Sequence, residues 1–127
     1  MTNYLTVIVV ALLDVFILSI WYSPLLFANL WSRLTKIKLK LTGGMVVIGI
    51  IGSLITSYVL SFVVSTLGLS GFWNGVMLGA LVWIGFIVPF LLNEVIYEKR
   101  DLSLYVLNVT GYLLILTVSA GIFAVWH

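Results

Sequence analysis

The chain has 127 residues, of which 63% are hydrophobic and only 8% are charged. A soluble globular domain carries about 25% charged residues, and a soluble fold of this length has too small an interior to hide so much apolar surface. The composition therefore excludes a soluble protein. The sequence contains no cysteine, which excludes disulfides, thiolate catalysis and cysteine-based metal sites.

Four apolar stretches cover most of the chain, at about residues 4–22, 45–67, 75–97 and 104–126. A helix rises about 1.5 Å per residue, so about 20 residues cross the ~30 Å hydrocarbon core of a bilayer. We therefore predict an all-α integral membrane protein, a four-helix bundle that forms a single domain over residues 1–127. The connections are too short to contain a soluble catalytic domain.

All six basic residues fall in two segments, one after the first span and one after the third: Arg33, Lys36, Lys38 and Lys40, then Lys99 and Arg100. Four crossings place both segments on the same side, and the positive-inside rule makes that side the cytoplasm. We therefore predict that both termini lie outside. The net charge of +2 is read as a topology signal and not as a sign of a nucleic-acid partner.

The segment of about residues 24–40 has a helical alternation of apolar and polar side chains. Ser23 and Pro24 suit the start of a helix. The pattern predicts a short amphipathic helix lying in the cytoplasmic interface, with Arg33, Lys36, Lys38 and Lys40 contacting anionic lipid headgroups. The alternative is that the first span continues through this segment with a kink at Pro24.

Small residues recur every four positions along the second span: Gly49, Ser53, Ser57, Ser61 and Ser65. Membrane helices associate by close backbone approach at small residues and by hydrogen bonds from hydroxyl groups. This stripe predicts a packing face, used either inside the bundle or between copies in a homo-oligomer.

Asp14 lies about ten residues into the first span, near the bilayer midplane. A carboxylate there costs several kcal/mol or is protonated, and intramembrane acids are functional-site candidates by default. The same helix continues to Trp21 and Tyr22, and residues 56–58 of the second span offer hydroxyl groups at similar depth. Asp14 is either a proton or substrate site or an acid that hydrogen-bonds to a neighbouring helix.

Asn93 and Glu94 form a second polar group, near the inner end of the third span. With Asn108 and Tyr112 they either line an inward-facing polar pocket or bond helix to helix. Glu94 can instead form a structural ion pair with Arg33, Lys99 or Arg100. Nothing in the sequence pairs a nucleophile with a base, and the single histidine is terminal. We therefore expect no enzyme activity, no cofactor and no metal site.

The stretch WYSPLLF at residues 21–27, followed by Trp31, resembles the opening signature of the bacterial "domain of unknown function 1761" membrane proteins. The run from Trp83 through Asn93 to Tyr112 is similar to the second half of that family. The resemblance implies a small, multi-pass, four-helix protein of the bacterial cytoplasmic (inner) membrane. It supplies no activity and no site residues.

Two functional hypotheses follow. The first is a structural, binding or oligomeric membrane component, whose partners are the lipid bilayer and, in a homo-oligomer, further copies of the same chain. The second is a proton-coupled transporter of small lipophilic molecules that uses Asp14. Small multidrug resistance transporters are similar in layout, with four spans and an acid in the first helix. A transporter needs Asp14 in a cavity that water reaches, whereas a structural protein tolerates Asp14→Asn.

Overall fold

The computed structural model describes residues 4–22, 28–35, 43–99 and 101–126. Its helices, in chain order, are α1 (Tyr4–Trp21), α2 (Ala28–Thr35), α3 (Gly43–Leu67), α4 (Phe72–Val82), the π-helical turn η1 (Trp83–Ile87), α5 (Val88–Ile96) and α6 (Leu102–Val125). Four helical stretches are long and apolar enough to cross a membrane, with α4, η1 and α5 forming the third. The predicted all-α, four-span architecture is confirmed, and the helix ends differ from the predicted spans by at most three residues.

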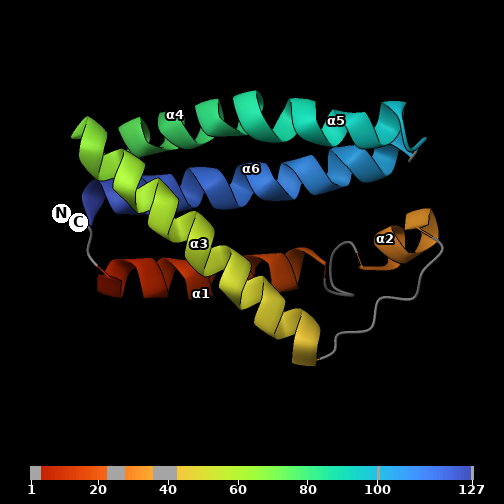
Figure 1. Ribbon diagram of the computed structural model, residues 1–127, viewed down its shortest axis with the longest axis horizontal. Helices are drawn as coiled ribbons and strands as arrows, with labels where there is room; N and C mark the ends of the chain where they lie inside the picture. Colours follow the sequence, from red (N-terminus) through yellow and green to blue (C-terminus); the bar gives the residue numbers. More distant parts are fainter. Residues whose placement is uncertain (1–3, 23–27, 36–42, 100, 127) are drawn as a thin grey trace.

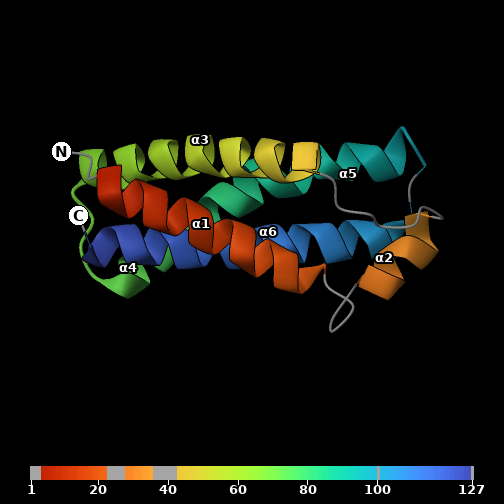
Figure 2. The same ribbon diagram turned by 90° about the horizontal axis from the view of Figure 1, so that it is seen from below.

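α6 is the central helix of the bundle. Half of its apolar window is buried, against 11–28% for the other three spans. α4 packs along α6 on one side, while α1 and α3 pack on each other and both contact α6 (Figures 1 and 2). The start of α1 and the end of α6 lie at the same end of the bundle, and α2 lies at the other. We call this other end, which carries Arg33 and Lys99, the basic end.

The half of the bundle away from the basic end is tightly packed. Its core joins the first half of α1 and the second halves of α3 and α6 through Val7, Val10, Leu60, Val64, Leu116, Ala120, Phe123 and Ala124. Gly75 and Gly79 bring the backbone of α4 close to α6. A Cβ at Gly79 would lie only 2.5 Å from the carbonyl oxygen of Leu116, and one at Gly75 would overlap Ala120. These two glycines are therefore used for packing inside the bundle.

The third span contains a wide helical turn directly before Pro89. Proline has no N–H, and in a regular helix its ring clashes with the carbonyl group four residues earlier. Here the N–H of Val88 bonds to the carbonyl oxygen of Trp83, five residues back. π-Helical turns occur as single turns inside longer α-helices, and proline is a common cause of irregular helix geometry. The turn lets the span continue as one element past Pro89.

α2 is a separate short helix that packs against α6. Leu30, Trp31 and Leu34 are partly buried, whereas Asn29 and Arg33 are exposed. The predicted amphipathic helix is thus present over Ala28–Thr35, the part of the predicted segment 24–40 that the structure describes. Residues 23–27 and 36–42 lie outside the described residues, and so do the predicted headgroup contacts Lys36, Lys38 and Lys40.

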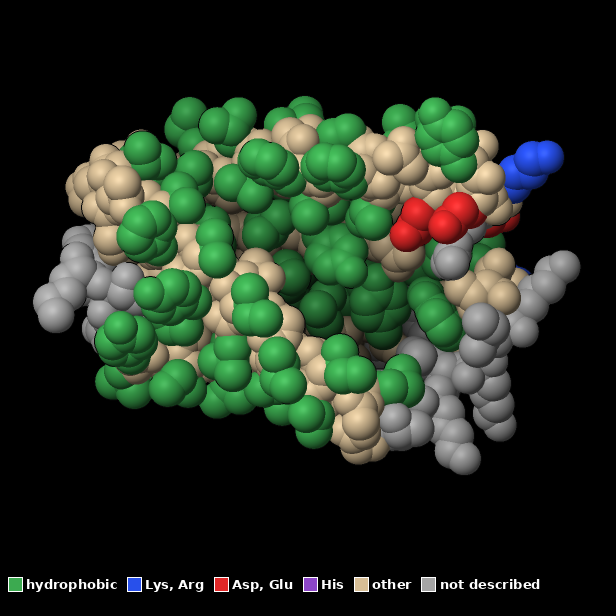
Figure 3. Space-filling view, in the orientation of Figure 1, with side chains coloured by type: hydrophobic (Ala, Val, Ile, Leu, Met, Phe, Trp, Pro, Cys, Tyr) green, Lys and Arg blue, Asp and Glu red, His purple; other side chains and the backbone are tan. Residues whose placement is uncertain are grey.

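The outward faces of the spans carry large apolar side chains. Ile48, Phe62 and Phe90, on two different spans, are each more than half exposed. Hydrophobic side chains cover most of the face drawn in Figure 3, and charged side chains gather at the basic end. A surface of this kind is stable only against lipid. The chain is therefore a multi-pass membrane protein.

Candidate functional site

Asp14 joins three helices in the interior of the bundle. Its Oδ1 accepts a hydrogen bond of 2.6 Å from the Ser119 hydroxyl on α6, and its Oδ2 accepts one of 3.4 Å from the Ser57 hydroxyl on α3. The Asp14 side chain is 2% exposed, and both serines are at most 1% exposed. Each carboxyl oxygen therefore has a buried hydroxyl partner, which is how proteins make a buried polar group tolerable.

Ser57 is one of the hydroxyl residues expected at the depth of Asp14, but Ser119 was missed. Asp14 lies ten residues from the start of α1, whereas Ser119 lies only six residues from the end of α6. The two meet because α1 crosses α6 obliquely (Figure 2). Counting residues from the membrane surface does not reveal such a pair. The run of small residues at 119–121 is the signal that marks this part of α6 as a contact.

Trp21 and Tyr22 do not lie beside Asp14 but fix the end of α1 on α6. The indole Nε1 of Trp21 donates to the carbonyl oxygen of Leu107 at 3.2 Å. The Tyr22 hydroxyl donates to Oδ1 of Asn108 at 2.6 Å. These bonds tie the end of α1 to α6 at the basic end, away from the core cluster of the packed half.

The third span is tied to the same region of α6 by two further aromatic side chains. The indole Nε1 of Trp83 donates to the carbonyl oxygen of Val109 at 2.6 Å, and the Tyr105 hydroxyl donates to the carbonyl oxygen of Val88 at 3.0 Å. Buried tryptophan and tyrosine side chains combine a large apolar contact with one polar bond. The basic half of the bundle is therefore held by directed bonds from aromatic side chains.

The predicted site residues are distributed over three places. Asn93 is exposed and Glu94 is partly buried on α5, and neither they nor Asp14 line the two cavities described below. Asn108, expected near them, bonds Tyr22 instead. The five candidates Asp14, Trp21, Tyr22, Asn93 and Glu94 do not form one constellation.

The small-residue stripe of α3 divides into two parts. Ser57 and Ser61 are buried in the bundle, Ser53 and Ser65 are partly buried, and Gly49 is exposed. The division arises because the start of α3 leans away from α6 (Figure 1). Gly49 and Ser53 therefore face a cavity that the tilt leaves open.

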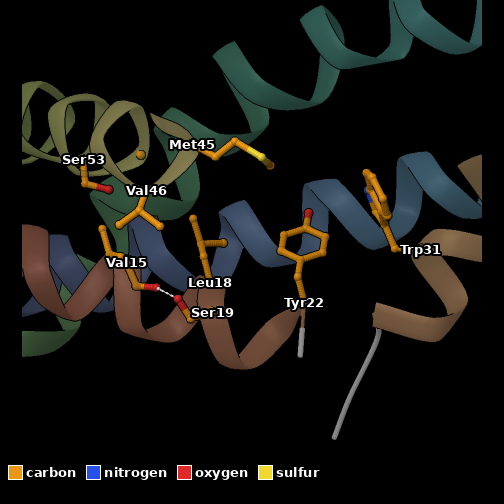
Figure 4. A pocket seen from close by; sticks show the side chains of 9 residues that line it. Val15, Leu18, Ser19, Tyr22, Trp31, Met45, Val46 and Ser53 are labelled. Carbon is orange, nitrogen blue, oxygen red and sulfur yellow. Dashed lines mark hydrogen bonds between the residues drawn. The ribbon is translucent and has the colours of Figure 1, made fainter. Parts of the chain in front are cut away.

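This apolar cavity, of about 310 Å³, lies between α1, α3 and α2 in the basic half of the bundle. Its walls are formed by Val15, Leu18, Ser19 and Tyr22 of α1, Met45, Val46, Gly49 and Ser53 of α3, and Trp31 of α2 (Figure 4). The Ser19 hydroxyl donates to the carbonyl oxygen of Val15 at 2.7 Å, so this polar group is already bonded within its own helix. The cavity offers mainly hydrocarbon to a ligand.

A second cavity, of about 530 Å³, adjoins the first at the basic end. It is lined by Trp31, Leu34 and Thr35 of α2, Lys99, Asp101, and Leu104 and Asn108 of α6. We call it the polar cavity. Trp31 lines both cavities, and the Tyr22–Asn108 hydrogen bond joins the wall of one to the wall of the other.

The family model described as "Protein of unknown function (DUF1761)" matches residues 5–124, which cover both cavities and all four spans except the first residue of α1 and the last of α6. The chain belongs to the DUF1761 family. The resemblance noted at residues 21–31 and 83–112 is thereby confirmed. A search of curated proteins and a search of solved structures found no match to this DUF1761 chain.

Proposed function

We propose that this protein is a non-catalytic binding protein of the membrane. It takes a hydrocarbon chain from the bilayer into the apolar cavity. We also place the basic end toward the cytoplasm of a bacterial inner membrane, because cytoplasmic loops carry an excess of lysine and arginine. The observation that carries the proposal is the cavity of about 310 Å³ between α1, α2 and α3.

The size and chemistry of the apolar cavity suit a hydrocarbon chain. Small-molecule sites have volumes of about 300–1,000 Å³ and mostly apolar walls. A cavity of about 150 Å³ binds benzene, so a cavity of about 310 Å³ has room for roughly a dozen carbon atoms on the same scale. Its walls come from the half of the bundle where the core cluster is absent, so a ligand there displaces no core side chain.

The surroundings of Asp14 favour binding over proton-coupled transport. Both of its oxygens accept hydrogen bonds from buried serines. Asp14 lines neither of the two described cavities. Transport through Asp14 requires water to reach the carboxyl group, whereas a hydrogen-bonded junction between helices requires that water be excluded from it.

The proposal is tested with phosphatidylcholine that carries a photoreactive diazirine in one acyl chain. The protein is reconstituted in bilayers that contain this lipid, irradiated, and mapped by peptide mass spectrometry. We expect concentrated labelling of the wall segments 15–22 and 45–53. Labelling spread evenly over lipid-facing side chains such as Phe62 would contradict the proposal.

A matched pair of glycine variants distinguishes the cavity from the general lipid surface. Gly49 and Gly52 lie one turn apart on α3, and a Cβ at either position meets no atom within 4 Å. Only Gly49 lines the cavity. Gly49→Leu should narrow the cavity and reduce labelling of its walls, whereas Gly52→Leu should leave the labelling unchanged.

A further inference from the structure

We infer that the ligand is an anionic phospholipid, with one acyl chain in the apolar cavity and its phosphate-bearing head in the polar cavity. The inference rests on the proposed function and adds the chemical class of the ligand. It is carried by the juxtaposition of two cavities of different chemistry, which share Trp31 as a wall.

The order of the two cavities matches the order of the parts of a lipid. The apolar cavity extends along α1 from Tyr22 back to Val15, within the membrane span. The polar cavity lies beyond it, at the ends of the spans, where Lys99 connects α5 to α6. Headgroups lie at this level of a membrane and acyl chains lie deeper. A soluble anion would use the polar cavity alone, so the adjoining apolar cavity favours a lipid.

The polar cavity carries groups that suit a phosphate. The ammonium group of Lys99 is the cation on its described wall, and basic pockets at the ends of membrane helices bind anionic lipid heads. Asn108 accepts from Tyr22 through its Oδ1, so its amide nitrogen is the part that can donate to a ligand. The acid on the wall, Asp101, already accepts from the backbone N–H of Ser103 at 2.7 Å as the N-cap of α6.

The backbone conformation of Lys99 also supports a role for this residue at the polar cavity. Its φ of 54° places it in the left-handed region, and it is the non-glycine residue of the described chain with a positive φ. Glycine or asparagine adopts this conformation more readily than lysine. Residues in unfavourable backbone conformations cluster at functional sites, which fits a role for the Lys99 side chain at the polar cavity.

The charge around the polar cavity does not oppose an anion. The sequence places six basic residues between Arg33 and Arg100, against three acidic residues at this end: Glu94, Glu98 and Asp101. This surplus attracts anionic lipids to the basic end in general, whereas Lys99, on the wall of the polar cavity, is the residue that we expect to set the preference of the site.

The test is competition between two lipids with identical acyl chains, followed by native mass spectrometry of the protein released from a neutral detergent. Equal amounts of phosphatidylglycerol and phosphatidylcholine are added. The wild-type protein should retain phosphatidylglycerol with a preference of roughly five-fold, the factor expected for one lysine near an anionic lipid. Equal retention would overturn the inference.

Two charge variants locate the preference. Lys99→Asn removes the charge and keeps a residue that accepts the left-handed backbone, so it should bring the preference close to one. Arg33→Gln removes the same charge from the exposed face of α2, outside both cavities, and should leave the preference intact. If Arg33→Gln abolishes the preference as completely as Lys99→Asn, the attraction is general to the basic surface and the inference is wrong.

The outcomes separate this inference from the proposed function. If photoreactive phosphatidylcholine labels the cavity walls but the two lipids are retained equally, the site for an acyl chain is supported. The inferred preference for an anionic head is then wrong. If the walls are not labelled, the proposed function itself fails. Displacement of bound phosphatidylglycerol by water-soluble glycerol 3-phosphate at similar concentration would show a site for the head alone, which also contradicts the inference.

Discussion

The Ser119 hydroxyl lies 2.6 Å from Oδ1 of Asp14, a hydrogen bond between residues 105 positions apart in the chain. It joins the first span to the last, and the bond from Ser57 adds the second span at the same carboxyl group. The contact lies between the packed half of the bundle and the half with cavities. Asp14 therefore fixes the point from which α1 and α3 diverge toward the basic end.

Replacement of Asp14 by leucine should destabilise the bundle. The change leaves the buried hydroxyls of Ser57 and Ser119 without their acceptor, at a cost of about 1–3 kcal/mol for each such group. Asp14→Asn keeps an acceptor oxygen and should cost less. The free energy of unfolding is measured by titration with SDS in mixed micelles. Ser19→Ala is the control, because Ser19 is exposed and bonds only its own helix. Equal stability of Asp14→Leu and wild type would rule out the role given to this junction.

Gly79→Ala should weaken the contact between α4 and α6. The new Cβ would lie 2.5 Å from the Leu116 carbonyl oxygen, which belongs to the backbone and cannot rotate away. Overpacking of this kind costs about 1–3 kcal/mol, measured as a loss in the free energy of unfolding. Gly52→Ala is the matched control. Its Cβ meets open space, and alanine stabilises a helix relative to glycine by up to about 1 kcal/mol. The two variants should therefore change stability in opposite directions.

Ser57→Leu tests whether the small-residue stripe of α3 packs within one bundle or between copies. Ser57 is completely buried against α1 in this chain. A leucine there should lower the melting temperature without changing the number of copies in detergent, measured by light scattering coupled to size exclusion. Val59→Leu, on the exposed face of the same helix, should change neither quantity. A lower copy number with unchanged melting would instead support the oligomer interface.

The architecture was predictable because bilayer thickness fixes the length of a span. Residues 45–67 were predicted and Gly43–Leu67 is observed, since the apolar run itself ends where the membrane ends. The pairing of Asp14 with a hydroxyl of the second span followed from equal distances to the membrane surface. The partner on α6 did not, because helix tilt changes depth by several residues.

The sequence pattern alone did not predict the two cavities. Gly49 and Ser53 belong to the same stripe as Ser57, yet they face a cavity because α3 leans away from α6. That tilt depends on packing among three helices and not on any local propensity. The placement of Trp31 between the two cavities likewise depends on how α2 docks on α6. The residues were noticed in the sequence, but their common site was not.

Tyr22→Phe should weaken the contact between α1 and α6 at the boundary of the two cavities. It should not affect the packed half of the bundle. The change removes the 2.6 Å bond to Asn108, for a loss of about 0.5–1.5 kcal/mol in the free energy of unfolding. It also frees Oδ1 of Asn108, an acceptor that repels the phosphate of either lipid, so the retention of phosphatidylglycerol and of phosphatidylcholine should both fall. Tyr58→Phe, on the exposed face of α3, removes the same hydroxyl away from both cavities and should alter neither measurement. A Tyr22→Phe protein that retains both lipids as well as the wild type does would show that the Tyr22–Asn108 bond does not orient the amide toward the polar cavity.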